Sequence, residues 1–120
     1  MEIRIVEKNN IKIALAHSDE PVVADGQSAL EFLMEIGYAY DCRIIAVNKA
    51  AFAEDFFRLS TGVAGEVAQK IVNYRYRLAV VGDFSGYQSK PLHDYIYECN
   101  NGGHLFFVAT EEEALEKLTG

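Results

Sequence analysis

Hydroxyl, amide and carboxylate side chains stand beside apolar runs at several places in the sequence. These are Asn48, the triplet Ser60-Thr61-Gly62, Asp83 with Ser85, and Thr110. If the apolar runs are parallel strands, ligands bind beyond their carboxyl ends, and these residues should share one rim of the sheet. Asn48, Asp83, Ser85 and Thr110 are therefore the candidate ligand site, and the triplet is a candidate phosphoacceptor or anion site.

The triplet Ser60-Thr61-Gly62 precedes a predicted helix. A helix N-terminus offers free backbone N–H groups and a partial positive charge, which suit an anion, and a hydroxyl there can be phosphorylated. The alternative is a capping role for Ser60 or Thr61, which stabilises a helix by about 1 kcal/mol. Both interpretations stay open at the level of sequence.

Asp83 opens the loop GDFSG after an apolar run. Its carboxylate can ligate magnesium or orient a hydroxyl, or it can close an Asx turn in its own loop. Neither G-x-G-x-x-G nor a P-loop pattern occurs, so no motif indicates nucleotide binding.

Histidines and cysteines are scattered through the chain. His17, His93 and His104 form no metal-binding pair, and Cys42 and Cys99 are far apart in apolar surroundings. We expect free thiols in a cytoplasmic protein, with no metal and no cofactor. Without a nucleophile beside a base, a non-enzymatic role is the simpler interpretation.

The charge balance argues against polyanionic partners. The chain has 11 basic and 18 acidic residues, a net charge of −7. Phosphate binding depends on Lys and Arg, so we expect neither nucleic acid nor a membrane as partner. The basic and aromatic run at 74–77 is read as a solvated edge in which Arg stacks on Tyr.

The elements that must position these residues follow from hydropathy patterns. Alternation predicts two strands joined by a tight Asn9-Asn10 turn, since asparagine tolerates positive φ. Unbroken apolar runs predict three interior strands. The five predicted strands cover residues 2–8, 11–15, 42–47, 78–81 and 104–108.

Four helices alternate with the strands. Asp25, Ser89 and Thr110 are expected to cap helices, and Gly37 is expected to end the first. Their apolar stripes lie within residues 26–36, 63–71, 90–99 and 111–118. The order ββ-α-β-α-β-α-β-α predicts one α/β domain over residues 1–120, with an N-terminal β-hairpin and a mostly parallel five-stranded sheet in a two- or three-layer sandwich.

Both faces of this sheet need cover, because the inner strands are apolar at consecutive positions. A folded chain of 13.4 kDa exposes roughly 6,500 Å². Four helices can cover both faces only if they divide between them. If right-handed crossovers place all helices on one face, the other must be covered by the 48–59 segment or by a second subunit. A homodimer is thus one expectation. The 48–59 segment itself is either a helix with an apolar stripe or a loop anchored by aromatic rings.

Long, specific stretches of the chain resemble a known family. The opening MEIRIVEKNNIKIA, the centre DFFRLSTGVAGEVAQKIVNYRYRLAVVGDFSGYQSKPLHDYIYECNNGG and the end LFFVATEEEALEKL are similar to an uncharacterised bacterial family, domain-of-unknown-function family 4180. The resemblance covers nearly the whole chain. It implies no established activity.

The order of elements also resembles, more distantly, that of STAS domains, the fold of anti-sigma factor antagonists. In those domains a Ser or Thr before a Gly, at the start of a helix, is the regulatory phosphoacceptor. The resemblance therefore implies that role for Ser60 or Thr61 before Gly62, with residues 48–59 inserted between strand and hydroxyl.

These observations are consistent with two functions. The first is a non-enzymatic regulatory or protein-interaction module with a STAS-like fold and a protein partner of unknown identity. The alternative is a small ligand-binding or enzymatic domain that uses the carboxyl rim of the sheet.

Overall fold

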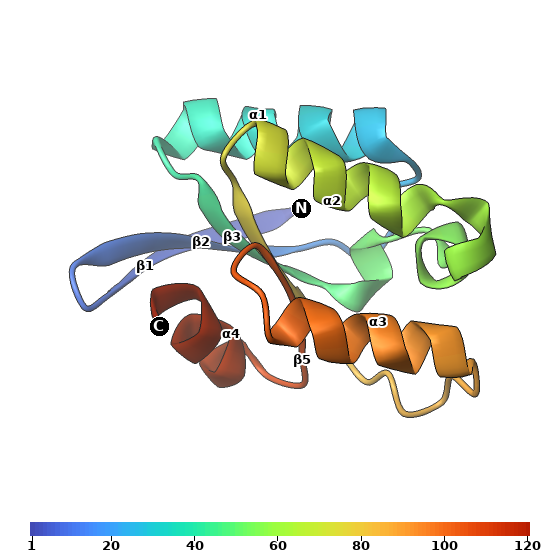
Figure 1. Ribbon diagram of the computed structural model, residues 1–120. Helices are drawn as coiled ribbons and strands as arrows, with labels where there is room; N and C mark the ends of the chain where they lie inside the picture. The colour runs from blue at the N-terminus through green and yellow to red at the C-terminus, as the bar shows by residue number, and fades with distance from the viewer.

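A computed structural model describes residues 1–120 as a five-stranded sheet with four α-helices (Figure 1). The strands lie in the order β1-β2-β3-β4-β5; β1 is antiparallel to β2 and all other pairs are parallel. The predicted fold class is confirmed. The strands are β1 Glu2–Lys8, β2 Ile11–His17, β3 Ile44–Asn48, β4 Arg77–Val81 and β5 Leu105–Val108.

The hairpin between β1 and β2 closes as predicted. Asn9 and Asn10 have φ angles of 54° and 65°, and Lys8 is opposite Ile11. Two successive residues with positive φ make the turn type whose twist matches that of paired strands.

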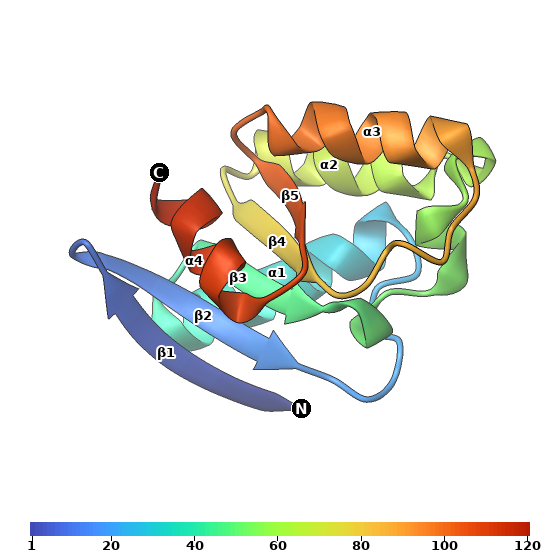
Figure 2. The same cartoon turned by 90° about the horizontal axis from the view of Figure 1, so that it is seen from below.

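Three helices lie on one face of the sheet and the fourth lies on the other (Figures 1 and 2). The first three pack over the larger core, and α4 packs over the smaller one. The predicted caps are confirmed for three helices: Asp25 accepts from Ser28 N–H, Ser89 from Leu92 N–H, and Thr110 from Glu113 N–H. The helices are α1 Gly26–Tyr40, α2 Val63–Asn73, α3 Lys90–Asn100 and α4 Glu111–Thr119.

The predicted end of α1 at Gly37 is wrong. The helix continues to Tyr40, and Asp41 ends it with a φ of 50°. Gly37 is instead a packing residue, because a Cβ there would lie 2.7 Å from the Tyr76 hydroxyl oxygen. The glycine therefore lets α1 approach Tyr76.

Of the two arrangements expected for the helices, the division between the two faces is the one observed, and the placement of all four on one face is wrong. Neither the 48–59 segment nor a second subunit is needed on the second face, because α4 covers it with Ala114 and Leu118, both fully buried. The molecule exposes 6655 Å² as a single chain, close to the value expected from its mass. The crossover rule does not constrain α4, since α4 does not connect two strands of this sheet.

The 48–59 segment belongs to the larger core. It forms three short 3₁₀ turns, η1 Lys49–Ala51, η2 Glu54–Phe57 and η3 Leu59–Thr61. Phe52, Phe56 and Phe57 are buried and contact one another edge-on or tilted. Of the two expectations, the loop anchored by aromatic rings is therefore confirmed.

The basic run at 74–77 is structural. Arg77 stacks on Phe106 and donates to the carbonyls of Gly103, Lys117 and Leu118, which fixes the last turn of α4. Arg43 rather than a neighbour in the run stacks on Tyr76. No helix of the molecule combines the length and apolar character that crossing a membrane requires.

Cys42 and Cys99 are both free thiols. Cys42 is buried, whereas Cys99 is only partly buried. Burial raises the pKa of the Cys99 thiol, so the reactive thiolate is disfavoured at neutral pH.

Candidate functional site

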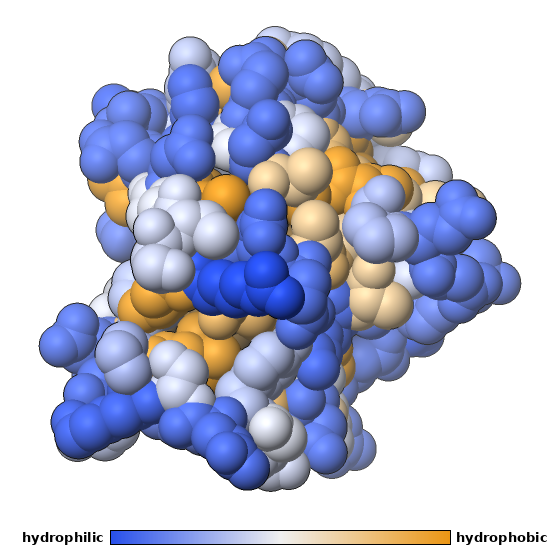
Figure 3. Space-filling view, turned by 90° about the vertical axis from the view of Figure 1, so that its right-hand side faces the viewer, coloured by the Kyte–Doolittle hydropathy of each residue, from blue (hydrophilic) through white to orange (hydrophobic).

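The polar residues singled out in the sequence lie at the carboxyl ends of the parallel strands or at the helix start that follows. Asn48 ends β3, Asp83 and Ser85 follow β4, and Thr110 follows β5. Figure 3 views the molecule from the side on which the 3₁₀ turns lie, and apolar patches appear there between hydrophilic residues.

Asn48 holds two strands together. Its amide oxygen accepts the Ser18 N–H at 2.8 Å, and its amide nitrogen donates to the Ser18 carbonyl at 2.7 Å. These bonds tie the chain leaving β2 to the end of β3. The side-chain amide is consequently engaged within the protein, although Asn48 lines the hollow described below.

Asp83 and Ser85 form a tight turn. Asp83 Oδ1 accepts the Ser85 N–H at 2.9 Å and the Ser85 hydroxyl at 2.6 Å. These hydrogen bonds, with a smaller contribution from the charge of Lys49, hold the pKa of the Asp83 carboxyl below its usual value. Asp83 is therefore ionised at neutral pH, and its second oxygen accepts no hydrogen bond from the protein.

The triplet before α2 divides into two kinds of hydroxyl. Thr61 Oγ1 is 2.7 Å from the Asp55 carbonyl and 2.8 Å from the Arg58 carbonyl, and it accepts the Val63 N–H at 3.2 Å. Gly62 supplies the left-handed turn into α2 with a φ of 80°. Ser60 is exposed, and its hydroxyl makes no hydrogen bond.

Thr110 lies away from the other candidates. Its hydroxyl caps α4 by accepting the Glu113 N–H at 3.1 Å, on the face of the sheet that α4 covers. Thr110 does not line the main hollow, so the structure brings Asn48 and Asp83 together there but not Thr110.

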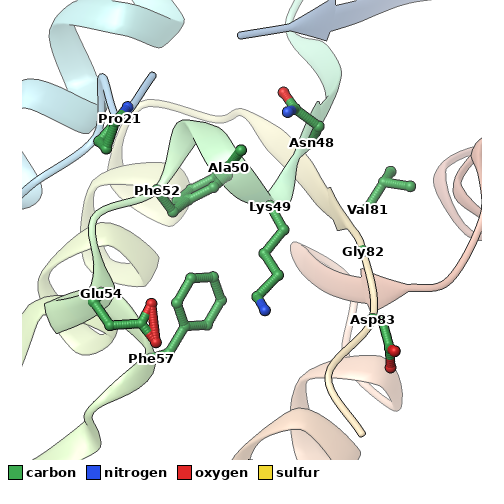
Figure 4. A pocket seen from close by; sticks show the side chains of 10 residues that line it. All are labelled: Pro21, Asn48, Lys49, Ala50, Phe52, Glu54, Phe57, Val81, Gly82 and Asp83. Atoms are coloured by element: carbon green, nitrogen blue, oxygen red, sulfur yellow. The ribbon is translucent and has the colours of Figure 1, made fainter. Parts of the chain in front are cut away.

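The main hollow is an open depression of about 680 Å³ (Figure 4). It lies where β3 and β4 end and the 3₁₀ turns begin, which is the position expected for a ligand in a parallel sheet. Its lining residues are Pro21, Asn48, Lys49, Ala50, Phe52, Glu54, Phe57, Val81, Gly82 and Asp83.

Lys49 is the central side chain of this hollow. Figure 4 shows it pointing between Phe57 on one side and Gly82 with Asp83 on the other. Its ammonium lies 4.6 Å from the ring centre of Tyr87, 5.7 Å from that of Phe57 and 6.0 Å from that of Phe84. None of the ion pairs of the chain includes it.

The aliphatic stem of Lys49 packs closely against the backbone of Gly82. A Cβ on Gly82 would lie 2.6 Å from the Lys49 Cβ, so only glycine fits there. Sequence reasoning missed Lys49, although it stands one position after Asn48 at the selected strand end. The three rings that surround its ammonium come from two separate segments, and no local pattern joins them.

Glu54 and Tyr87 form a hydrogen-bonded pair beside Lys49. The Tyr87 hydroxyl donates to Glu54 Oε1 at 2.8 Å. Burial, followed by this hydrogen bond and the nearby negative charge, raises the pKa of Tyr87 to about 12. The second oxygen of Glu54 accepts no hydrogen bond from the protein.

Because the pKa of Tyr87 is raised, the stability of the fold changes with pH in the alkaline range. The folded state holds the proton more tightly than the unfolded chain, so the stabilisation is complete below the ordinary pKa of 10 and is lost as pH rises to about 12. We expect Tyr87→Phe to flatten the fall in unfolding free energy over this range. Urea denaturation at several pH values measures the unfolding free energy of both proteins. An equal fall of this free energy with pH in the wild type and in Tyr87→Phe would contradict the role of Tyr87.

The arrangement lacks the pairing that nucleophilic catalysis uses. The ring of His93 contacts the Tyr87 carbonyl, and no three His, Cys, Asp or Glu side chains gather as metal ligands. The site instead offers one ammonium group, two free carboxylate oxygens and an aromatic wall. Groups of these kinds can bind and orient a polar molecule.

The fold and this rim define an α/β protein with a mostly parallel sheet and a hollow at its carboxyl ends. More narrowly, the chain belongs to the family described as Domain of unknown function (DUF4180), whose model matches residues 8–118. The match confirms the resemblance that the sequence indicates, and it leaves out most of β1. No curated protein and no solved structure matches the chain, so the relation to STAS domains stays a prediction.

Proposed function

We propose that this chain is a non-enzymatic binding module that takes a small zwitterion of the amino-acid class in the hollow around Lys49. One observation carries the proposal: the Lys49 ammonium faces an open hollow, lies against three aromatic rings and has no carboxylate within ion-pair distance. A cation so placed is available to an anionic ligand group.

The neighbouring charges favour a zwitterion over a simple anion. The carboxylates of Glu54 and Asp83 also line the hollow, and each keeps one oxygen free of protein hydrogen bonds. The carboxylate of the ligand would bind the Lys49 ammonium. The ammonium group of the ligand would donate a hydrogen bond to Glu54 or Asp83. Phe52 and Phe57 offer apolar surface to a side chain.

A ligand screen with a matched pair of variants tests this proposal. The twenty amino acids are screened by thermal shift, and each hit is titrated calorimetrically against the wild type, Lys49→Met and Lys12→Met. Methionine keeps the apolar stem of Lys49 and removes its charge. Lys12 is an exposed lysine at the opposite end of the sheet, so its variant controls for the change in net charge.

We expect Lys49→Met to weaken binding about tenfold or more, because a charge-assisted hydrogen bond contributes about 1.5–3 kcal/mol. Lys12→Met should bind as the wild type does. The hit's methyl ester and its deaminated analogue should both bind less tightly. No hit in the screen, or equal binding by both variants, would overturn the proposal.

A second candidate function is a regulatory protein-interaction module switched by phosphorylation at Ser60. What favours Ser60 over Thr61 is its exposed hydroxyl, which makes no hydrogen bond, beside a second hollow of about 460 Å³. Thr61 would have to give up its bonds within the loop. Phosphoproteomic analysis of the protein purified from its native cell tests this function. A phosphate on Ser60 supports it, and an unmodified Ser60 under all growth conditions opposes it.

A further inference from the structure

The two edges of the sheet differ in how their backbone groups are satisfied. At β5 the Asn100 side chain accepts the Phe107 N–H at 2.8 Å and donates to the Phe107 carbonyl at 3.0 Å, as a neighbouring strand would. At β1 no element lies along the outer side (Figure 2). Its seven residues pair with β2 without a bulge. A long regular edge of this kind is a template for another strand.

The hairpin turn determines which backbone groups of β1 point outward. In a two-residue hairpin the residues that flank the turn, here Lys8 and Ile11, form a hydrogen-bonded pair. Hydrogen-bonded and open pairs then alternate along the ladder. The N–H and C=O groups that point away from β2 are therefore those of Ile3, Ile5 and Glu7.

We propose that two copies of this chain pair antiparallel through their β1 strands, about a two-fold axis at Ile5. In this register Ile5 meets Ile5 of the second copy, and Ile3 meets Glu7. All outward backbone groups of the strand then find partners. The Ile5 side chain, 40% exposed in the single chain, is covered by its symmetry mate.

The charges along β1 support this register. Glu2 stands opposite Lys8 of the second copy, and the two-fold axis repeats the pair at the other end of the strand. Both are open pairs, in which side chains approach more closely than in hydrogen-bonded pairs. A two-fold axis at Glu7 would instead place two glutamates opposite each other. Arg4 is already neutralised, because it pairs with Glu111 at 2.8 Å.

The uncovered surface beside β1 is apolar as well. A hollow of about 300 Å³ lies between β1 and α1. Its lining residues are Met1, Ile3, Phe32, Glu35, Ile36, Ala39 and Tyr40. Of these Met1 is 61% exposed, so this flank of the molecule loses apolar exposure when a second sheet continues the first.

A charge swap tests both the dimer and its register. Sedimentation equilibrium at tens of micromolar is measured for the wild type, for Glu2→Lys, for Lys8→Glu and for the double variant. Each single change turns both ion pairs into like-charge pairs, so we expect dimer dissociation to become easier on the order of tenfold. The double variant restores opposite charges and should return to the wild-type association.

Three results of this experiment would contradict the dimer or its register. A monomeric wild type overturns the proposal, and so does a dimer whose association is unchanged in the single variants. A double variant as weak as the single ones also contradicts it, because the two charges then do not meet. Since both residues are exposed or partly exposed on the edge strand, circular dichroism of all four proteins should be the same.

Discussion

Replacing Phe56 with alanine will lower the free energy of unfolding by about 3–5 kcal/mol. The side chain is 1% exposed and is one of the largest fully buried groups in the molecule. Its ring centre lies 4.8 Å from that of Phe52, 5.0 Å from that of Phe57 and 6.0 Å from that of Phe107. Truncation thus leaves a cavity where the 3₁₀ turns meet β5.

Urea denaturation followed by circular dichroism measures this loss. Tyr97→Ala is the matched control, because it removes an aromatic ring that is 73% exposed and should change stability by less than about 0.5 kcal/mol. A loss for Phe56→Ala as small as that of the control would mean that the 49–61 segment is not part of the core. The hollow around Lys49 would then lack its wall.

Replacing Leu118 with alanine will cost about 2–5 kcal/mol. Leu118 and Ala114 are the two fully buried side chains with which α4 covers the second face of the sheet. The loss reaches beyond α4, since Phe106 and Ala79 of the sheet are covered by the same small cluster. Few other side chains can fill the gap.

The control for Leu118 is Glu116→Ala, an exposed change on the same helix. It should leave the unfolding midpoint nearly unchanged. If Leu118→Ala is equally silent, α4 does not cover this face in solution. Light scattering of the variant then shows whether a second subunit covers it.

Most of the fold follows from the sequence because the relevant signals are local. The turn at Asn9-Asn10 needs two residues that tolerate positive φ, and the caps Asp25, Ser89 and Thr110 need one oxygen each. Each of these depends on neighbours within a few positions. The strands are equally predictable, because β1 and β2 show apolar alternation and the other three are continuous apolar runs.

The two errors concern tertiary contacts. Gly37 has the residue type of a helix end, but its use depends on Tyr76, which is distant in sequence and leaves no room for a Cβ. The position of α4 depends on the second face of the sheet, which the first three helices leave uncovered. The crossover rule applies only to helices that connect two parallel strands, and α4 follows the last strand.

The site was predictable as a location and not as a set of side chains. The rim rule selected Asn48 and Asp83, which do line the hollow. It could not show that Asn48 is engaged with Ser18, nor that the next residue, Lys49, carries the free charge. Side-chain direction at a strand end depends on the turn that follows, and here that is an irregular 3₁₀ segment.

Chemical-shift mapping shows whether a small zwitterion binds at Lys49. Amide ¹H–¹⁵N spectra of the wild type and of Lys49→Met are recorded with and without the amino acid that shifts the melting temperature most. We expect wild-type shifts confined to residues 48–57 and 81–87, and much smaller shifts in the variant at the same ligand concentration. Shifts centred elsewhere, or the same shifts in both proteins, would contradict binding at Lys49.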